Sequence, residues 1–201
     1  LGGMSGDKIT TVDGTDVILG DNGIVTYAGA TGSLKLSQVV STVPSRGGDD
    51  EITAGDGTKH IIGGYGSDTI TAGTGNHTVI GDNGQADFDT DGAPKILQTT
   101  DTEAHPEYGG ADTISVGSGD NIILGGMSGD KITTVDGTDV ILGDNGIVTY
   151  AGATGSLKLS QVVSTVPSRG GDDEITAGDG RKDLIGGFGS DTLNAGVGNN
   201  V

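Results

Sequence analysis

Single apolar residues recur every nine positions through most of the chain. In most of these frames an Asp stands two positions earlier and a Gly four positions earlier. A nine-residue period fits neither an α-helix nor a coiled coil, but it suits a half-coil in which a turn of about five or six residues leads into a very short strand. The apolar positions form four series: Ile9, Ile18 and Tyr27; Ile52, Ile61, Ile70, Val79 and Phe88; Ile114, Ile123, Ile132, Ile141 and Tyr150; Ile175, Leu184 and Leu193.

Two such half-coils make one eighteen-residue coil, with its apolar side chains inside. Stacked coils, about 4.8 Å apart, give two parallel sheets with turns along both edges. Glycine, 41 of the 201 residues, supplies the positive backbone φ that tight turns need, and it also makes long helices unfavourable. The pattern therefore predicts an all-β chain, specifically a parallel β-roll or β-solenoid.

The chain is a tandem array. Residues 1–57 are identical to residues 124–180, a displacement of 123 residues. The string GDNG starts at Gly20, Gly81 and Gly143, so each long repeat contains two halves of about 61 residues. We predict one continuous solenoid, with β-roll blocks at 1–28, 47–88, 109–151 and 170–201 and longer inserts at 29–46, 89–108 and 152–169.

Each insert contains an alternating or apolar segment that predicts a strand. The first and third contain SLKLSQVV, and the second contains KILQTT in the same place. Two interpretations stay open: the insert supplies a sixth half-coil with an enlarged loop, or it loops out after five half-coils. In the first case each 61-residue unit makes three coils, and 123 residues advance by about 29 Å.

The charge balance favours a cation as partner. Ten Lys and Arg residues face 28 acidic ones, for a net charge of −18, and 24 of the acids are Asp, a residue typical of turns. This charge disfavours nucleic acid and anionic membrane surfaces. The absence of Cys excludes disulfides and thiolate metal sites, and no apolar run approaches the length of a membrane span.

Several segments resemble one known nonapeptide. GGMSGDKIT (residues 2–10), GGYGSDTIT (63–71), GGADTISVG (109–117) and GGFGSDTLN (186–194) are similar to the GGxGxDxUx motif of the repeats-in-toxin, haemolysin-type calcium-binding β-rolls. The resemblance covers nearly all of the chain outside the inserts. It implies several calcium ions between successive turns on one edge, held by Asp carboxylates and backbone carbonyls, the hard oxygen ligands that calcium prefers.

Carried over residue by residue, the motif predicts nine metal ligands: Asp7, Asp16, Asp50, Asp68, Asp112, Asp130, Asp139, Asp173 and Asp191. Acids eighteen residues apart are expected to share a site, and the best pairs are Asp50 with Asp68, Asp112 with Asp130, and Asp173 with Asp191. Metal is expected mainly on one edge, because other residues replace the Asp on the opposite edge. These residues are Lys59, His77, Asn121, Lys182 and Asn200; Asn121 still offers a carbonyl oxygen, and the lysines cannot bind calcium.

The motif also breaks at the ends of the blocks, where Val25, Ala86 and Val148 stand in the Asp position. The GDNG acids Asp21, Asp82 and Asp144 occupy a different motif position, and we interpret them as turn residues that bond their own backbone. His60, His77 and His105 lack ligand spacing and are interpreted as surface residues.

The leading functional hypothesis is a calcium-stabilised structural segment of a longer secreted or surface-attached bacterial adhesin, matrix or fibre protein. Its partners would be calcium and adjacent repeats or copies of itself, end to end. We do not expect an enzyme, because acids that recur every nine residues do not define one catalytic pair. The alternative is the calcium-binding C-terminal repeat region of a secreted enzyme or toxin. A flat face that binds ice or carbohydrate would need a regular outward ladder of Thr.

Overall fold

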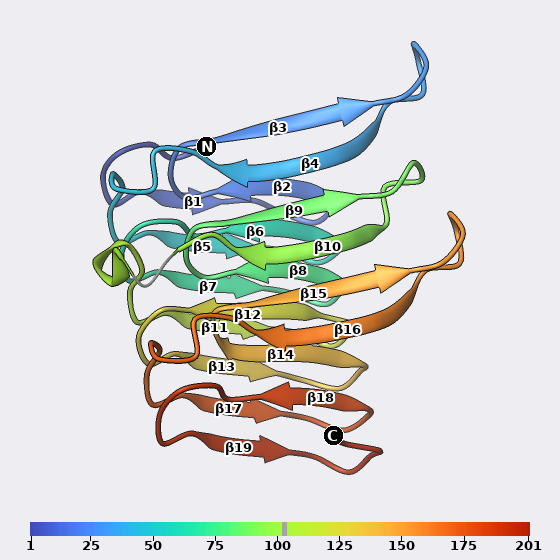
Figure 1. Ribbon diagram of the computed structural model, residues 1–201. Coiled ribbons are helices and arrows are strands. Elements are labelled where there is room, and N and C mark those ends of the chain that lie inside the picture. Colours follow the sequence, from blue (N-terminus) through green and yellow to red (C-terminus); the bar gives the residue numbers. More distant parts are fainter. Residues whose placement is uncertain (102–103) are drawn as a thin grey trace.

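The computed structural model describes residues 1–101 and 104–201, and nearly all of its regular secondary structure is β-strand. Nineteen strands form three stacked sheets, and the short 3-10 turn Pro106–Tyr108 lies between two of the strands (Figure 1). Within the described residues, no helix is long and apolar enough to cross a membrane. The prediction of an all-β chain is confirmed.

Two of the sheets are parallel, and successive strands of the chain alternate between them. Sheet A contains β1 (Lys8–Thr10), β5 (Glu51–Ala54), β7 (Thr69–Ala72), β11 (Thr113–Val116), β13 (Lys131–Thr134), β17 (Glu174–Ala177) and β19 (Thr192–Ala195). Sheet B contains β2 (Asp16–Leu19), β6 (Lys59–Ile62), β8 (His77–Ile80), β12 (Ile122–Gly126), β14 (Asp139–Asp144) and β18 (Lys182–Ile185). We call a sheet A strand and the sheet B strand that follows it a strand pair.

The nine-residue period sets the register of both parallel sheets. Ile52 pairs with Ile70 in sheet A, and Ile61 pairs with Val79 in sheet B. These side chains fill a narrow core between the two sheets, where most of them are fully buried. Buried apolar and outward polar residues alternate along sheet A, as expected for a sheet with one face toward the core.

The third sheet consists of hairpins that leave the parallel strands at GDNG. Sheet C is antiparallel, and its three hairpins follow β2, β8 and β14 (Figure 1). Its strands are β3 (Gly23–Ala28), β4 (Lys35–Ser41), β9 (Gly84–Phe88), β10 (Pro94–Thr99), β15 (Gly146–Ala151) and β16 (Lys158–Ser164). The strands predicted at SLKLSQVV and KILQTT are therefore present, as the second strand of each hairpin.

The hairpins correct the predicted block boundaries. Tyr27, Phe88 and Tyr150 continue the nine-residue spacing, but they lie in β3, β9 and β15 of sheet C and not in half-coils. The blocks predicted as 1–28, 47–88 and 109–151 thus each end in a hairpin strand. The physical reason is that an antiparallel neighbour needs only a short turn, so a strand that follows GDNG pairs at once with the strand after it.

The correction also changes the length of the repeat. Of the two interpretations left open for the inserts, the one with three coils for each 61 residues does not hold, because each half-repeat holds two strand pairs and one hairpin. A 123-residue repeat therefore contains four strand pairs and advances by about 19 Å at the usual spacing of strands.

Sheet C covers the outer face of sheet B. Leu97 and Val148 of the hairpins pack against Ile62, Ile80 and Leu124, which point away from the first core. Sheet B is consequently buried on both faces over most of its length, whereas sheet A is buried on one.

The outer face of sheet A carries a row of small polar side chains, six with a hydroxyl group and one with an amide. Its members, which are neighbours across the sheet, are Thr10, Thr53, Thr71, Ser115, Thr133, Thr176 and Asn194. The adjacent row is not uniform, because the ion pairs Lys8–Glu51 and Lys131–Glu174 interrupt its threonines.

Candidate metal-binding edge

One edge of the stack carries a continuous column of aspartates. Each stands directly before a strand of sheet A, where the chain enters that sheet. We call this column the acidic edge; its members are Asp7, Asp50, Asp68, Asp112, Asp130, Asp173 and Asp191. All seven belong to the predicted ligand set.

The acidic edge is held together by a ladder of hydrogen bonds. The backbone N–H of Asp50 donates to Oδ1 of Asp68 over 2.7 Å, and the N–H of Asp68 donates to Oδ1 of Asp112 over 2.7 Å. The predicted pairs, eighteen residues apart, are therefore adjacent, and so are acids separated by a hairpin. The sequence analysis did not predict that the acids on either side of an insert are neighbours. The motif Asp that follows each insert could have indicated it. The same bond joins Asp7 to Asp50, Asp112 to Asp130, Asp130 to Asp173, and Asp173 to Asp191.

The second carboxylate oxygen of these residues is buried without a partner. This holds for Oδ2 of Asp50, Asp68, Asp112, Asp130 and Asp173. A carboxylate oxygen in such a place is costly, because burial removes its water and nothing replaces it.

Glycine carbonyls lie beside these oxygens. A Cβ built on Gly63 would collide with both Oδ2 of Asp68 and the carbonyl oxygen of Gly81. The same crowding occurs at Gly125, beside Oδ2 of Asp130. The glycines thus bring a carboxylate oxygen and a carbonyl oxygen to one small space, which explains why no side chain is present there.

The electrostatics of the acidic edge oppose ionisation in the absence of a cation. Burial, reinforced by the charge of Asp112, raises the pKa of Asp68 to about 9. Burial also raises the pKa of Asp173 to about 7 and that of Asp50 to about 6. The pKa values of Asp112 and Asp130 are raised well above the usual range for the same reason.

The oxygens of the acidic edge fit a hard cation such as calcium. Unpartnered carboxylate oxygens and neighbouring glycine carbonyls are the donor type that calcium prefers. In the part of the chain that the structure describes, no three His, Cys, Asp or Glu side chains are gathered in a metal-binding group. An ion on this edge would therefore need backbone carbonyls among its ligands.

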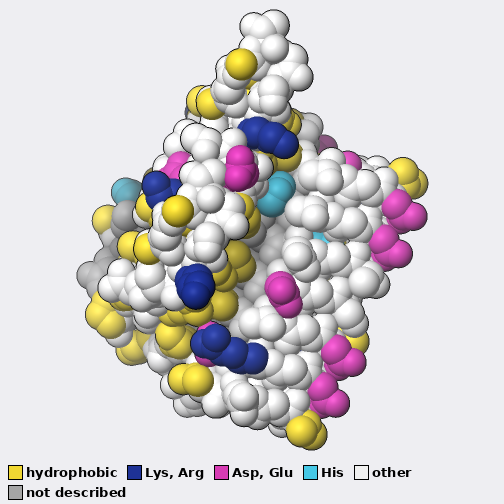
Figure 2. Space-filling view, turned by 90° about the vertical axis from the view of Figure 1, so that its right-hand side faces the viewer, with side chains coloured by type: hydrophobic (Ala, Val, Ile, Leu, Met, Phe, Trp, Pro, Cys, Tyr) yellow, Lys and Arg dark blue, Asp and Glu magenta, His cyan; other side chains and the backbone are white. Residues whose placement is uncertain are grey.

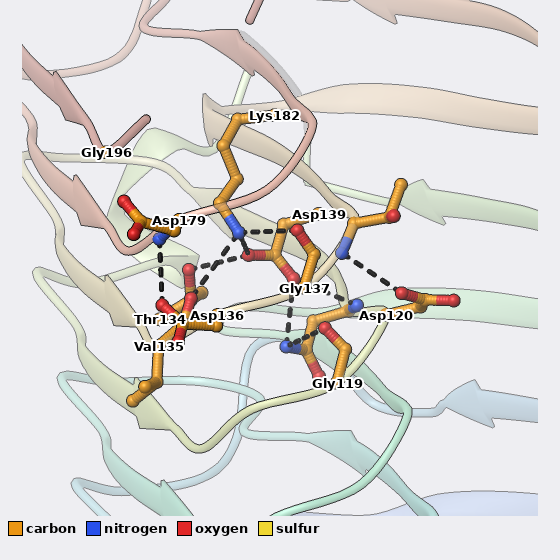
Figure 3. A network of polar contacts seen from close by, with 12 residues as sticks. Gly119, Asp120, Thr134, Val135, Asp136, Gly137, Asp139, Asp179, Lys182 and Gly196 are labelled. Carbon is orange, nitrogen blue, oxygen red and sulfur yellow. Dashed lines mark hydrogen bonds and ion pairs between the residues drawn. The ribbon is translucent and has the colours of Figure 1, made fainter. Parts of the chain in front are cut away.

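The opposite edge has a different composition. We call it the mixed edge; it comprises Asp16, Lys59, His77, Asn121, Asp139, Lys182 and Asn200, which stand where the chain passes from sheet A to sheet B. Here the predicted ligands Asp16 and Asp139 each have a lysine as partner. Lys59 Nζ lies 2.7 Å from Oδ2 of Asp16, and Lys182 Nζ lies 2.7 Å from Oδ2 of Asp139 (Figure 3).

At Asp16 the lysine partner reverses the electrostatic effect seen on the acidic edge. The hydrogen bond from Lys59 lowers the pKa of Asp16. Oδ1 of Asp139 accepts the backbone N–H and the side-chain amide of Asn121, and its Oδ2 also accepts the hydroxyl of Thr134. Oδ2 of Asp16 is occupied by Lys59 and the hydroxyl of Thr11, and both oxygens of Asp139 are satisfied, so neither residue is a candidate metal ligand in this arrangement.

The GDNG acids bond to the backbone, but not to their own. Oδ1 of Asp82 accepts the N–H of Gly110 over 2.8 Å, and Oδ2 accepts the N–H of Met127. Asp82 thereby fixes the segment that returns from a hairpin and the Gly-rich turn of the next strand pair. Asp144 makes the equivalent bonds to Gly171 and Phe188.

Two of the histidines contradict the surface interpretation. His60 and His77 are buried in sheet B, and burial lowers the pKa of His60 to about 4. His60 contacts Thr78 and the ring of Phe88, so the hairpin layer covers it. His77 Nε2 lies 2.8 Å from the carbonyl oxygen of Gly73 in its own turn. His105 is exposed, as predicted.

A groove of about 590 Å³ separates the hairpin layer from the turns of the mixed edge. Figure 2 faces this side of the molecule and shows the hollow between the two layers. Its lining mixes apolar and charged side chains, among them Tyr150, Leu157 and Arg181. Burial raises the pKa of Tyr150 to about 12.

Comparison with known proteins gave no match, whether to a family model, to a curated protein or to a solved structure.

Proposed function

We propose that the chain is a calcium-stabilised structural segment of a secreted or surface-attached bacterial adhesin, matrix or fibre protein. In this proposal sheets A and B are the two faces of a β-roll, and the hairpins loop out from it. The observation that carries the proposal is the column of buried Asp residues whose Oδ2 atoms have no partner and lie beside glycine carbonyls.

The energetics support a cation as part of the folded state. The acidic edge stacks buried carboxylates on neighbouring strands of a chain with a net charge of −18. When these groups are ionised, their repulsion and desolvation oppose the small gain from a core of single Ile, Val and Ala side chains. A divalent ion that binds only the folded chain would stabilise it by mass action.

The proposed location follows from the supply of calcium. Weak extracellular sites bind calcium at roughly 10⁻⁴ to 10⁻³ M, so such a segment would fold after export. Its role would be structural and not catalytic, since the same acids recur at successive strand pairs. The proposed neighbours are further repeats or copies of this segment, which would extend all three sheets.

Calcium-dependent folding tests this proposal. Circular dichroism of the chain at neutral pH in chelator should show loss of β-structure, and calcium at millimolar or lower concentration should restore it. Magnesium is the matched control and should substitute poorly, because it holds its water tightly and demands a regular octahedron of ligands. A β spectrum that is the same in chelator and in calcium would reject the proposal.

A further inference from the structure

Two lysines of the mixed edge are fully buried, which is unusual for this residue. The other five lysines, at positions 8, 35, 95, 131 and 158, are exposed. Lys59 and Lys182 stand at equivalent places, as the first residues of β6 and β18. Their burial is therefore a property of this position in the fold and needs an explanation.

Each buried ammonium group has three oxygen partners. Lys182 Nζ lies 2.8 Å from the carbonyl oxygen of Gly137, 3.4 Å from that of Val135 and 2.7 Å from Oδ2 of Asp139 (Figure 3). All three oxygens come from the strand pair before it. An ammonium group has three protons to donate, so this set matches its capacity.

The arrangement at Lys59 is the same. Its Nζ lies 3.0 Å from the carbonyl oxygens of Val12 and Gly14 and 2.7 Å from Oδ2 of Asp16. Each lysine thus faces two turn carbonyls and one carboxylate. Those are hard oxygen donors, the type that also binds divalent cations.

Other members of the mixed edge satisfy turn carbonyls with neutral donors. Asn121 Nδ2 lies 3.2 Å from the carbonyl oxygen of Gly119, and Asn200 Nδ2 lies 2.9 Å from that of Gly196. On the acidic edge the corresponding side chain is always Asp, which has no proton to donate when it is ionised. The side chains of the mixed edge therefore supply the positive or donor groups that the acidic edge lacks.

We propose that the ammonium groups of Lys59 and Lys182 are resident cations, each filling an oxygen site that would otherwise take a divalent metal ion. The mixed edge is then held together without metal at these two strand pairs. Replacing either lysine by the Asp of the motif should open a calcium site there. This inference goes beyond the proposed function and does not rest on it, because the lysine contacts are independent of any ion on the acidic edge.

The test counts calcium ions in Lys182→Asp and in the unchanged chain by isothermal titration calorimetry. We expect about one additional ion in Lys182→Asp. The matched control is Lys131→Asp, which makes the same change of charge at an exposed position, beside Glu174. No additional ion in Lys182→Asp, or an equal gain in Lys131→Asp, would overturn the inference. If the unchanged chain binds no calcium and Lys182→Asp binds one, the proposed function fails while this inference stands.

A second measurement on the unchanged chain applies even if Lys182→Asp does not fold. The folded chain is treated with an amine-acylating reagent, and mass spectrometry follows each lysine. Lys59 and Lys182 should react more than roughly tenfold slower than the five exposed lysines, because reaction requires local opening of the edge. Equal rates for all seven lysines in the folded chain would overturn the inference.

Discussion

The acidic edge and the mixed edge solve the same structural problem in different ways. On both edges, the residue that stands two positions before a core side chain points into a Gly-rich turn, where most of these residues are buried. On the mixed edge, Lys182 lies against Asp139 and two turn carbonyls, so charge and hydrogen bonds are satisfied within the chain. On the acidic edge, Asp68 and Asp112 each keep a buried oxygen without a partner.

The two edges show how one motif position, occupied by Lys or by Asp, changes the electrostatics of a turn. A lysine supplies its edge with a cation from within the chain, whereas in the proposed function an aspartate leaves its edge dependent on a bound ion or on protonation. The effect on ionisation has opposite signs, since the pKa of Asp68 is raised to about 9 by burial and that of Asp16 is lowered by Lys59. In the proposed function, one chain thus combines an edge whose stability depends on bound ions with an edge that carries its own cations.

The largest expected effect is a dependence of folding on pH without metal. In the unfolded chain Asp ionises near a pKa of about 3.9, but in the folded chain burial raises the pKa of Asp50 to about 6 and that of Asp68 to about 9. Folding therefore favours the protonated acids. Stability should be greatest below about pH 4 and fall as the pH rises through 6 to 9.

Circular dichroism and denaturant titrations in metal-free buffer would measure this dependence. Saturating calcium should remove most of it, because an ion stabilises the ionised carboxylates. A stability that is constant from pH 4 to pH 9 in metal-free buffer would contradict the comparison between the two edges.

An intermediate effect is expected from removing charge on the acidic edge. Asp50→Asn together with Asp68→Asn should lower the number of bound calcium ions by about one or more, because both side chains offer oxygens to adjacent spaces. In metal-free buffer at neutral pH, the same change should stabilise the fold by about 1–4 kcal/mol, since a neutral amide avoids the cost of protonating Asp68 or of burying an ionised Asp50.

The matched control for that variant is Asp49→Asn with Asp172→Asn. Both residues are exposed, and each uses Oδ1 to accept a backbone N–H that Asn can also accept. The control should leave the number of bound calcium ions unchanged. It should change the free energy of unfolding by no more than about 0.5 kcal/mol. Equal calcium counts in calorimetry for both double variants would remove the acidic edge from consideration as a metal site.

The smallest effect is expected at the GDNG motif. In Asp82→Asn an NH₂ group replaces one of the two carboxylate oxygens, so the N–H of either Gly110 or Met127 loses its acceptor. The free energy of unfolding should fall by about 1–3 kcal/mol. The calcium count should stay the same, because Asp82 already uses both oxygens on backbone donors. A lower ion count from calorimetry would instead make Asp82 a ligand.

The sequence predicted the regular part of the fold well. Ile52 and Ile70, and likewise Ile114 and Ile132, are neighbours in sheet A because two nine-residue steps return the chain to the same sheet. The acidic edge also followed from the motif, including all three pairs placed eighteen residues apart. Periodicity and side-chain chemistry are both local properties, so the sequence carries them directly.

The hairpins could not be predicted from spacing alone. Tyr27 continues the nine-residue period by coincidence, and the period does not say whether the next strand runs parallel or antiparallel. One signal was the loss of the motif Asp at the ends of the blocks, as at Val25, which pairs with Val39 within the hairpin. His60 was assigned to the surface for the same reason, because only the hairpin layer buries it.

The contacts of the buried lysines could not be predicted from the sequence either. Lys59 was excluded as a calcium ligand by its charge, but the sequence did not indicate its partners, which include the carbonyl oxygens of Val12 and Gly14. Every residue has a carbonyl, so the sequence does not indicate which ones converge on a side chain. Only the stacking of β6 on β2 brings those oxygens to the ammonium group.

The third sheet has a mechanical consequence. A long thin body resists bending according to its thickness, and the resistance of a plate grows with roughly the cube of that thickness. Sheet C adds a layer about 10 Å from sheet B and runs along the stack as a rib, on one side only. An array of these repeats would therefore behave as an asymmetric beam, stiffer than a two-sheet ribbon and with one preferred direction of flexure.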